Sequence, residues 1–143
     1  MTEQANGGNN TQNNGKPTKR YTEQNVYKDS EVLIFSLLQY FRHIPRDMRF
    51  LLGSRMVNDA LDMSKNISRG FRVLDGTRKS GYITEAQVLC DSVTVIIEAL
   101  HNIEVISTDF YLQSKTKLDN IQAQLYSWRK FIEHHRDGEN MHK

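Results

Sequence analysis

Apolar residues recur along most of this chain at intervals of three and four, the spacing that places them on one face of an α-helix. The clearest case lies between residues 82 and 110, where the intervals of four and three alternate without a fault. Such a heptad repeat is typical of helices whose side chains interdigitate with those of a neighbour. It therefore predicts a helix over about residues 82–109. The repeat consists of Tyr82, Ala86, Leu89, Val93, Ile96, Leu100, Ile103, Ser107 and Phe110.

The same spacing predicts three further helices, over about residues 30–42, 46–74 and 114–135. No segment shows the alternating pattern of a strand. Short loops between four helices place sequential neighbours antiparallel. The predicted fold is therefore all-α, an antiparallel up-down-up-down four-helix bundle with a disordered N-terminal tail. The apolar stripes of these three helices contain Leu33, Leu37, Tyr40, Phe41 and Ile44; Leu52, Met56, Ala60, Met63, Ile67, Phe71 and Leu74; and Leu118, Ile121, Leu125, Trp128 and Ile132.

Polar residues and proline mark the expected helix ends. Asp29 or Ser30 is expected to cap the first helix and Ser114 the fourth, because their side-chain oxygens accept a hydrogen bond from a free backbone N–H. Pro45 breaks the first helix and suits the first position of the second. Residues 75–81, Asp-Gly-Thr-Arg-Lys-Ser-Gly, are expected to form a loop.

Two glycines and two core candidates add to this outline. Gly76 is expected to end the second helix, since glycine tolerates the left-handed conformation found there. Gly70 lies within an apolar stripe, which suggests a close approach to a neighbouring helix. Trp128 lies on the fourth stripe and is expected in the core. Cys90, beside a core position, is expected to be a buried or half-buried, inert thiol.

The two ends of the chain are polar. Residues 1–20 consist mainly of Asn, Gln, Gly and Thr, a composition that cannot bury enough apolar surface to order a segment. We therefore expect a disordered tail over residues 1–22, the bundle over 23–136 and a frayed tail over 137–143. With a single cysteine and no apolar run long enough for a membrane span, a cytoplasmic protein without membrane contact is expected.

Charge is unevenly distributed along the chain. Residues 42–79 carry nine basic and four acidic side chains, a net charge of +5, whereas residues 80–128 carry two basic and six acidic ones, a net charge of −4. On the second predicted helix, a polar stripe lies opposite the apolar one. It contains Arg55, Asn58, Asp62, Lys65, Arg69 and Arg72. This row would suit a phosphate backbone, a solvated face, or pairing with an acidic helix of another subunit.

The sequence has none of the motifs expected of an enzyme. It lacks a glycine-rich phosphate loop, a Ser-centred elbow and a Cys/His ligand set. Glu98 and His101 have the spacing found in di-iron bundles, but that site needs two such pairs and two more carboxylates. His134, His135 and His142 have no second ligand cluster to complete a metal site. We therefore expect neither enzymatic activity nor a metal or other cofactor.

Three stretches resemble a known family. Ile-Pro-Arg-Asp-Met-Arg-Phe-Leu-Leu-Gly at 44–53 is similar to the start of the second helix in a bacterial four-helix bundle family first noticed in ribosomal RNA intervening sequences. Asn-Ile-Ser-Arg-Gly at 66–70 resembles the Asn-Ile-Ala-Glu-Gly signature of that branch, with Ser68 and Arg69 in place of Ala and Glu. The end of the fourth helix, 121–130, resembles a second branch, the accessory variability determinants of diversity-generating retroelements. That branch has two glycines where this chain has Tyr126 and Ser127.

The resemblance covers about residues 27–132 and implies a specific role. Accessory determinants are non-enzymatic bundles that form a homopentamer and bind a reverse transcriptase and nucleic acid, RNA or DNA, through basic surface. On this chain the implied phosphate contacts are Arg55, Lys65, Arg69 and Arg72, followed by Arg129 and Lys130 beside the predicted core tryptophan. The alternative is a structural bundle of the intervening-sequence type with no nucleic-acid role.

Overall fold

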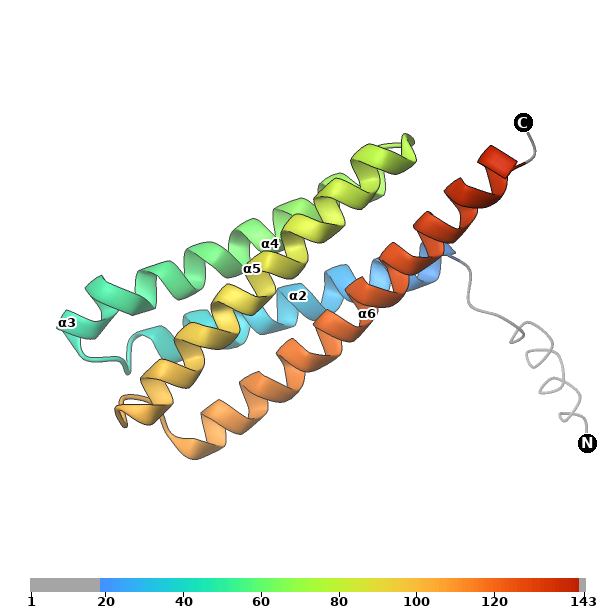
Figure 1. Ribbon diagram of the computed structural model, residues 1–143. Helices are drawn as coiled ribbons and strands as arrows, with labels where there is room; N and C mark the ends of the chain where they lie inside the picture. Colours follow the sequence, from blue (N-terminus) through green and yellow to red (C-terminus); the bar gives the residue numbers. More distant parts are fainter. Residues whose placement is uncertain (1–18, 142–143) are drawn as a thin grey trace, which may run out of the picture.

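The computed structural model describes residues 19–141, with side chains described over residues 25–135. Four long helical segments pack side by side, as Figure 1 shows, and no strand occurs among the described residues. Each segment is antiparallel to the next along the chain, and the first also packs against the last, which closes the bundle. The predicted antiparallel four-helix bundle is thus confirmed. The elements are α2 (Lys19–Phe41), α3 (Arg46–Met48), η2 (Arg49–Gly53), α4 (Ser54–Arg72), α5 (Gly76–Asn102) and α6 (Thr108–Met141).

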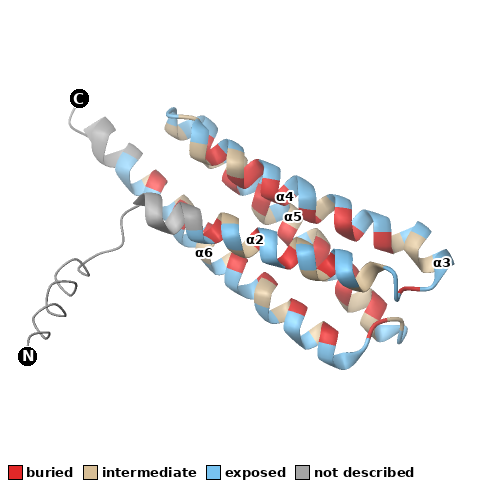
Figure 2. Ribbon diagram, turned by 180° about the vertical axis from the view of Figure 1, so that it is seen from behind, coloured by how far each residue is buried: buried red, intermediate tan, exposed pale blue. Residues whose placement is uncertain are grey.

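Buried residues lie on the inward faces of all four segments and form one continuous core (Figure 2). The stripe predicted for α6 is buried throughout, and so is the middle of the stripe on α4. Leu74 was wrongly placed in that stripe. Its side chain is 96% exposed, because α4 ends at Arg72 and the next residue, Val73, is extended.

Helix α2 begins at least eleven residues before the expected start. Lys19–Phe41 takes in residues 19–22, which were assigned to the tail; the rest of that tail, residues 1–18, lies outside the described residues. The predicted cap at Asp29 or Ser30 is therefore wrong. Ser30 is buried, and its hydroxyl donates to the carbonyl of Tyr27 at 2.7 Å and to Ser64 Oγ at 3.2 Å. This polar contact joins α2 to α4 inside the bundle.

The fourth helix is longer than predicted at both ends. It begins at Thr108 rather than Ser114 and continues to Met141, beyond His135 and into the segment expected to fray. Ser114 is fully buried within α6, and its hydroxyl has no hydrogen-bond partner among the described residues. The predicted cap at Ser114 is thus wrong, because the preceding residues Thr108–Gln113 continue the helix backwards.

The predicted loop over 75–81 is also wrong. Helix α5 begins at Gly76, and Asp75 caps it by accepting a hydrogen bond from Thr77 N at 3.2 Å. Gly76 does not have a positive φ and does not end α4. Lys79 is only 5% exposed, and its ammonium group donates to the carbonyl of Gly70, one of the last carbonyls of α4. A contact between two helices thus keeps this polar segment helical.

The turn between α5 and α6 interrupts the predicted heptad repeat. Helix α5 ends at Asn102, and the turn places Glu104 at a φ of 61°, in the left-handed region. Ile103 is exposed as a result, whereas Phe110 is buried at the start of α6. Tyr40 of α2 holds this end of the bundle together. Its ring stacks on Phe110 at 3.9 Å between centroids, and its hydroxyl accepts a hydrogen bond from the backbone N–H of Ser107 at 3.0 Å.

The close approach predicted at Gly70 is confirmed. A Cβ atom there would lie 3.0 Å from Cη2 of Trp128 on α6 and 3.7 Å from Cγ1 of Ile83 on α5. Trp128 is buried, as expected, and its ring lies 5.5 Å from that of Phe71 between centroids. Cys90 is buried too, which raises the pKa of its thiol to about 12. The predicted burial of Trp128 and of Cys90 is confirmed.

Candidate nucleic-acid interface

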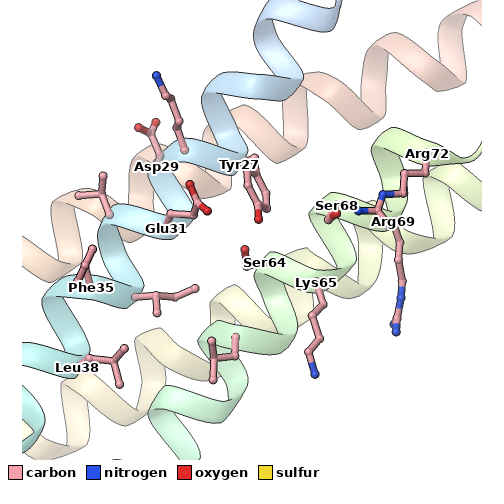
Figure 3. Close-up of a pocket in the computed structure, with 14 residues that line it drawn as sticks. Tyr27, Asp29, Glu31, Phe35, Leu38, Ser64, Lys65, Ser68, Arg69 and Arg72 are labelled. Atoms are coloured by element: carbon pink, nitrogen blue, oxygen red, sulfur yellow. The ribbon is translucent and has the colours of Figure 1, made fainter.

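A groove of about 1000 Å³ runs between α2 and α4. Figure 3 shows its two walls. Tyr27, Glu31 and Ser64 point into the space between the helices, whereas Lys65 and Arg69 extend away from α2 along the outer edge of α4. The groove therefore has an α2 wall and a basic rim, and the rim is part of the stripe singled out in the sequence.

The basic rim is formed by the exposed side chains of Lys65, Arg69 and Arg72. Their spacing of four and three residues aligns them along α4. Lys65 lies 3.6 Å from Asp62, an exposed pair that contributes little. Neither Arg69 nor Arg72 has a carboxylate partner among residues 25–135. Within the described part of the chain, the two arginines at the C-terminal end of α4 thus present positive charge without a paired carboxylate.

Arg55 continues this row toward the other end of α4. Its side chain is exposed, and its Nε lies 4.0 Å from a carboxylate oxygen of Asp59. That carboxylate also accepts a hydrogen bond of 2.5 Å from the hydroxyl of Ser92 on α5, so it is held toward the neighbouring helix. Arg55 is consequently free to turn toward a ligand at little cost.

Arg129 and Lys130 do not join this row. The side chain of Trp128 points across the core to Gly70 of α4. Each further helical residue is rotated by about 100°, so Lys130 points away from α4. Arg129 lies 3.7 Å from Glu133, and Lys130 lies over the ring of Tyr126, 5.6 Å from its centroid. The structure thus separates the second predicted pair of contacts from the first set.

The α2 wall carries an apolar surface that sequence reasoning missed. Val32, Phe35 and Leu38 are exposed on the face opposite the buried Leu33 and Leu37, and Phe35 is 66% exposed. The available signal was that residues 32–35, Val-Leu-Ile-Phe, are apolar on every side of the helix. Such a helix is typically covered on both faces. This surface is suited to contact with another polypeptide.

Carboxylates lie near the same wall. Asp29 accepts a hydrogen bond of 2.6 Å from Gln124 of α6 and is thereby drawn to the far side of α2. Glu31 is exposed and points into the groove (Figure 3). An anion bound in the groove would therefore lie against α4 rather than against α2.

The remaining candidate chemistry is sparse in the described part of the chain. No group of three or more His, Cys, Asp and Glu side chains there is arranged to hold a metal ion. His101 is stacked on Tyr111, with ring centroids 4.2 Å apart, and His142 lies outside the described residues. None of the helices, over the residues described, has the length and apolar character needed to cross a membrane.

In comparisons with known proteins, no family model matches this chain and no curated protein matches it. The architecture itself defines the class of the described part as an antiparallel four-helix bundle, with a basic rim along one edge of a groove.

Proposed function

We propose that this protein is a non-enzymatic, oligomeric accessory protein that binds nucleic acid and serves the reverse transcriptase of a diversity-generating retroelement. Nucleic-acid binding is supported mainly by the exposed row from Arg55 to Arg72, in which two arginines lack carboxylate partners among the described residues. The element served, its enzyme and a pentameric assembly are what the resemblance at residues 44–53, 66–70 and 121–130 implies.

The dimensions of the row support phosphate binding. Arg55 and Arg72 are seventeen residues apart on one helical segment, which corresponds to about 26 Å at a rise of 1.5 Å per residue. A rigid row of that length would follow several successive phosphates of a structured RNA or of DNA. Arginines contact phosphates through two parallel N–H donors, which favours Arg69 and Arg72, without carboxylate partners among residues 25–135, as the strongest contacts.

The α2 wall supports a protein partner. Val32, Phe35 and Leu38 expose apolar surface without a contribution to the core, and exposed apolar patches commonly mark protein contacts. The proposal therefore assigns the α2 wall to the reverse transcriptase or a second copy, and the basic rim of α4 to nucleic acid.

A second candidate function is a structural oligomer of the intervening-sequence type without nucleic acid. It is favoured by the exposed face of α5, where Val88 and Val95 alternate with acidic side chains. The acidic members are Glu85 and Asp91. A neighbouring copy that placed this face against α4 would neutralise the basic rim and leave it unavailable for phosphate.

Binding of a fluorescein-labelled RNA hairpin, followed by anisotropy, tests the proposal. We expect the purified protein to bind, and the double reversal Arg69→Glu, Arg72→Glu to abolish binding. The matched control is Lys115→Glu, Lys117→Glu on α6, which changes the net charge by the same amount outside the row. Equal loss in both variants, or no binding by wild type, would remove the nucleic-acid role. A loss of self-association in the first variant alone would then support the structural alternative.

A further inference from the structure

The segment that leads into α4 contains a π turn that the sequence did not predict. Within Arg49–Gly53 the backbone N–H of Ser54 bonds to the carbonyl of Arg49, five residues back instead of four. The hydroxyl of Ser54 donates to the same carbonyl at 3.0 Å. Single π turns inside helices are uncommon and occur frequently at functional sites.

Gly53 fixes the position of this turn. A Cβ atom at Gly53 would lie 3.1 Å from the ring of Phe41 on α2 and 3.6 Å from Cδ1 of Ile44. The glycine therefore allows the backbone of this turn to pack closely against the end of α2. The residues on the other side of the turn face solvent. Phe50 is 80% exposed and Leu51 is 66% exposed, so neither contributes much to the core.

Beside the exposed Phe50 is a small hollow of about 290 Å³. It is lined by Phe41, Arg46, Arg49, Phe50 and Ser54. Two positive charges thus share the hollow with an aromatic ring. No carboxylate among residues 25–135 pairs with either arginine. The one nearby in sequence, Asp47, accepts the backbone N–H of Met48 at 2.9 Å.

Arg49 is only partly buried, so its side chain is accessible from this hollow. Its Nε is shielded from solvent and has no hydrogen-bond partner among the described residues. Charged guanidinium groups bind phosphate oxygens through strong hydrogen bonds. The hollow therefore combines two guanidinium groups with an exposed aromatic ring.

We propose that this hollow binds one nucleotide of a single-stranded nucleic acid, with a phosphate on Arg46 and Arg49 and the base stacked on Phe50. This inference rests on the proposed function and adds a strand type and a second contact to it. Single strands are favoured because a base must leave its partner before it can stack on a side chain. Arg55 is the second residue of α4 and follows the π turn by two residues, so a strand that leaves the hollow along α4 can continue past Arg55 toward the basic rim.

Anisotropy with a labelled 12-nucleotide single strand tests the hollow. Phe50→Ala should weaken binding roughly 5- to 150-fold, the effect of losing one stacked base, and should leave the salt dependence unchanged. Leu51→Ala is the matched control, since it removes another exposed apolar side chain of the same π turn, and it should bind like wild type. Arg46→Gln with Arg49→Gln should lower the slope of log affinity against log salt by about 0.7, which corresponds to one phosphate that is no longer neutralised.

The results separate this inference from the proposed function. If wild type, Phe50→Ala and the Arg46→Gln, Arg49→Gln variant all bind the strand equally well, the hollow is not a nucleotide site. The assignment of the basic rim to nucleic acid is then unaffected. If the Phe50→Ala and Leu51→Ala variants lose affinity equally, stacking on Phe50 is excluded. If the hollow variants lose binding to the single strand while Arg69→Glu, Arg72→Glu still binds the RNA hairpin, the nucleotide site in the hollow is supported and the assignment of the basic rim to nucleic acid is wrong. No binding of any probe by wild type overturns both. Circular dichroism melts confirm that each variant is folded.

Discussion

Gly70 and Gly81 allow one substitution, glycine to alanine, to be tested in two helices with opposite expected results. In a helix interior, alanine is more favourable than glycine by about 1 kcal/mol. Gly81 lies on the exposed side of α5, and a Cβ atom there would meet nothing within 4 Å. Gly81→Ala should therefore gain most of that amount.

At Gly70 the added methyl group meets Trp128. The Cβ position lies 3.0 Å from Cη2, well inside the usual carbon–carbon contact of about 3.5–4.0 Å. The indole cannot easily withdraw, because Phe71 and Lys79 lie beside it at 5.5 Å and 5.8 Å. Overpacking of this kind costs about 1–3 kcal/mol, which exceeds the gain from helix propensity. We expect Gly70→Ala to lose about 1 kcal/mol, so that the two variants differ by about 2 kcal/mol.

Thermal unfolding followed by circular dichroism measures this difference. With an unfolding entropy of about 2.1 cal/mol/K per residue, a difference of 2 kcal/mol in this 143-residue chain corresponds to about 7 °C in Tm. The order should be Gly81→Ala above wild type and Gly70→Ala below it. In a Trp128→Phe background the penalty at Gly70 should shrink, because the clashing ring atoms are gone. Equal stabilisation by both alanines would refute the packing described between α4 and α6.

Three further predictions concern single side chains. The Cys90 thiol should react with a disulfide reagent only after unfolding. Burial raises its pKa to about 12, whereas an unfolded thiol ionises near pH 8.5, so the folded protein loses stability as pH rises from about 8.5 toward 12. Cys90→Ala should reduce this loss, and an unchanged alkaline melt would contradict the prediction. Tyr40→Phe should cost about 1 kcal/mol in urea unfolding, since Ser107 N then loses its acceptor while the stacking on Phe110 remains. Glu104→Gly should stabilise by up to about 1 kcal/mol, because glycine accepts a φ of 61° without strain; a lower Tm would argue against that turn geometry.

The apolar pattern was sufficient to predict the number of helices and most of the core. Met56, Ala60, Met63 and Ile67 are buried at intervals of three and four, as one inward face requires. Local residue type was less reliable at helix ends. The segment from Asp75 to Gly81 has the composition of a loop, yet it is helical, and Lys79 bonds to the carbonyl of Gly70 on another helix. Pattern analysis along one chain does not reveal such a tertiary contact.

The candidate site was predictable only in part. The spacing of Lys65, Arg69 and Arg72 on one exposed face follows from helix geometry. The absence of carboxylate partners for Arg69 and Arg72 among residues 25–135, and the groove beside them, depend on how α2 lies against α4. The π turn depends on the contact between Gly53 and Phe41, which belong to different helices. A uniform helical repeat therefore gave no indication of the π turn or of the hollow beside Phe50.

The most direct test of the central proposal is the salt dependence of RNA binding. The affinity for a labelled hairpin would be measured by anisotropy at several NaCl concentrations, for wild type and for Arg69→Gln with Arg72→Gln. Wild type should show a steep loss of affinity with salt, and the variant should show a slope smaller by about 1.8, the release of ions from two phosphate contacts. An unchanged slope, or binding that does not depend on salt, would contradict the assignment of the basic rim of α4 to nucleic acid.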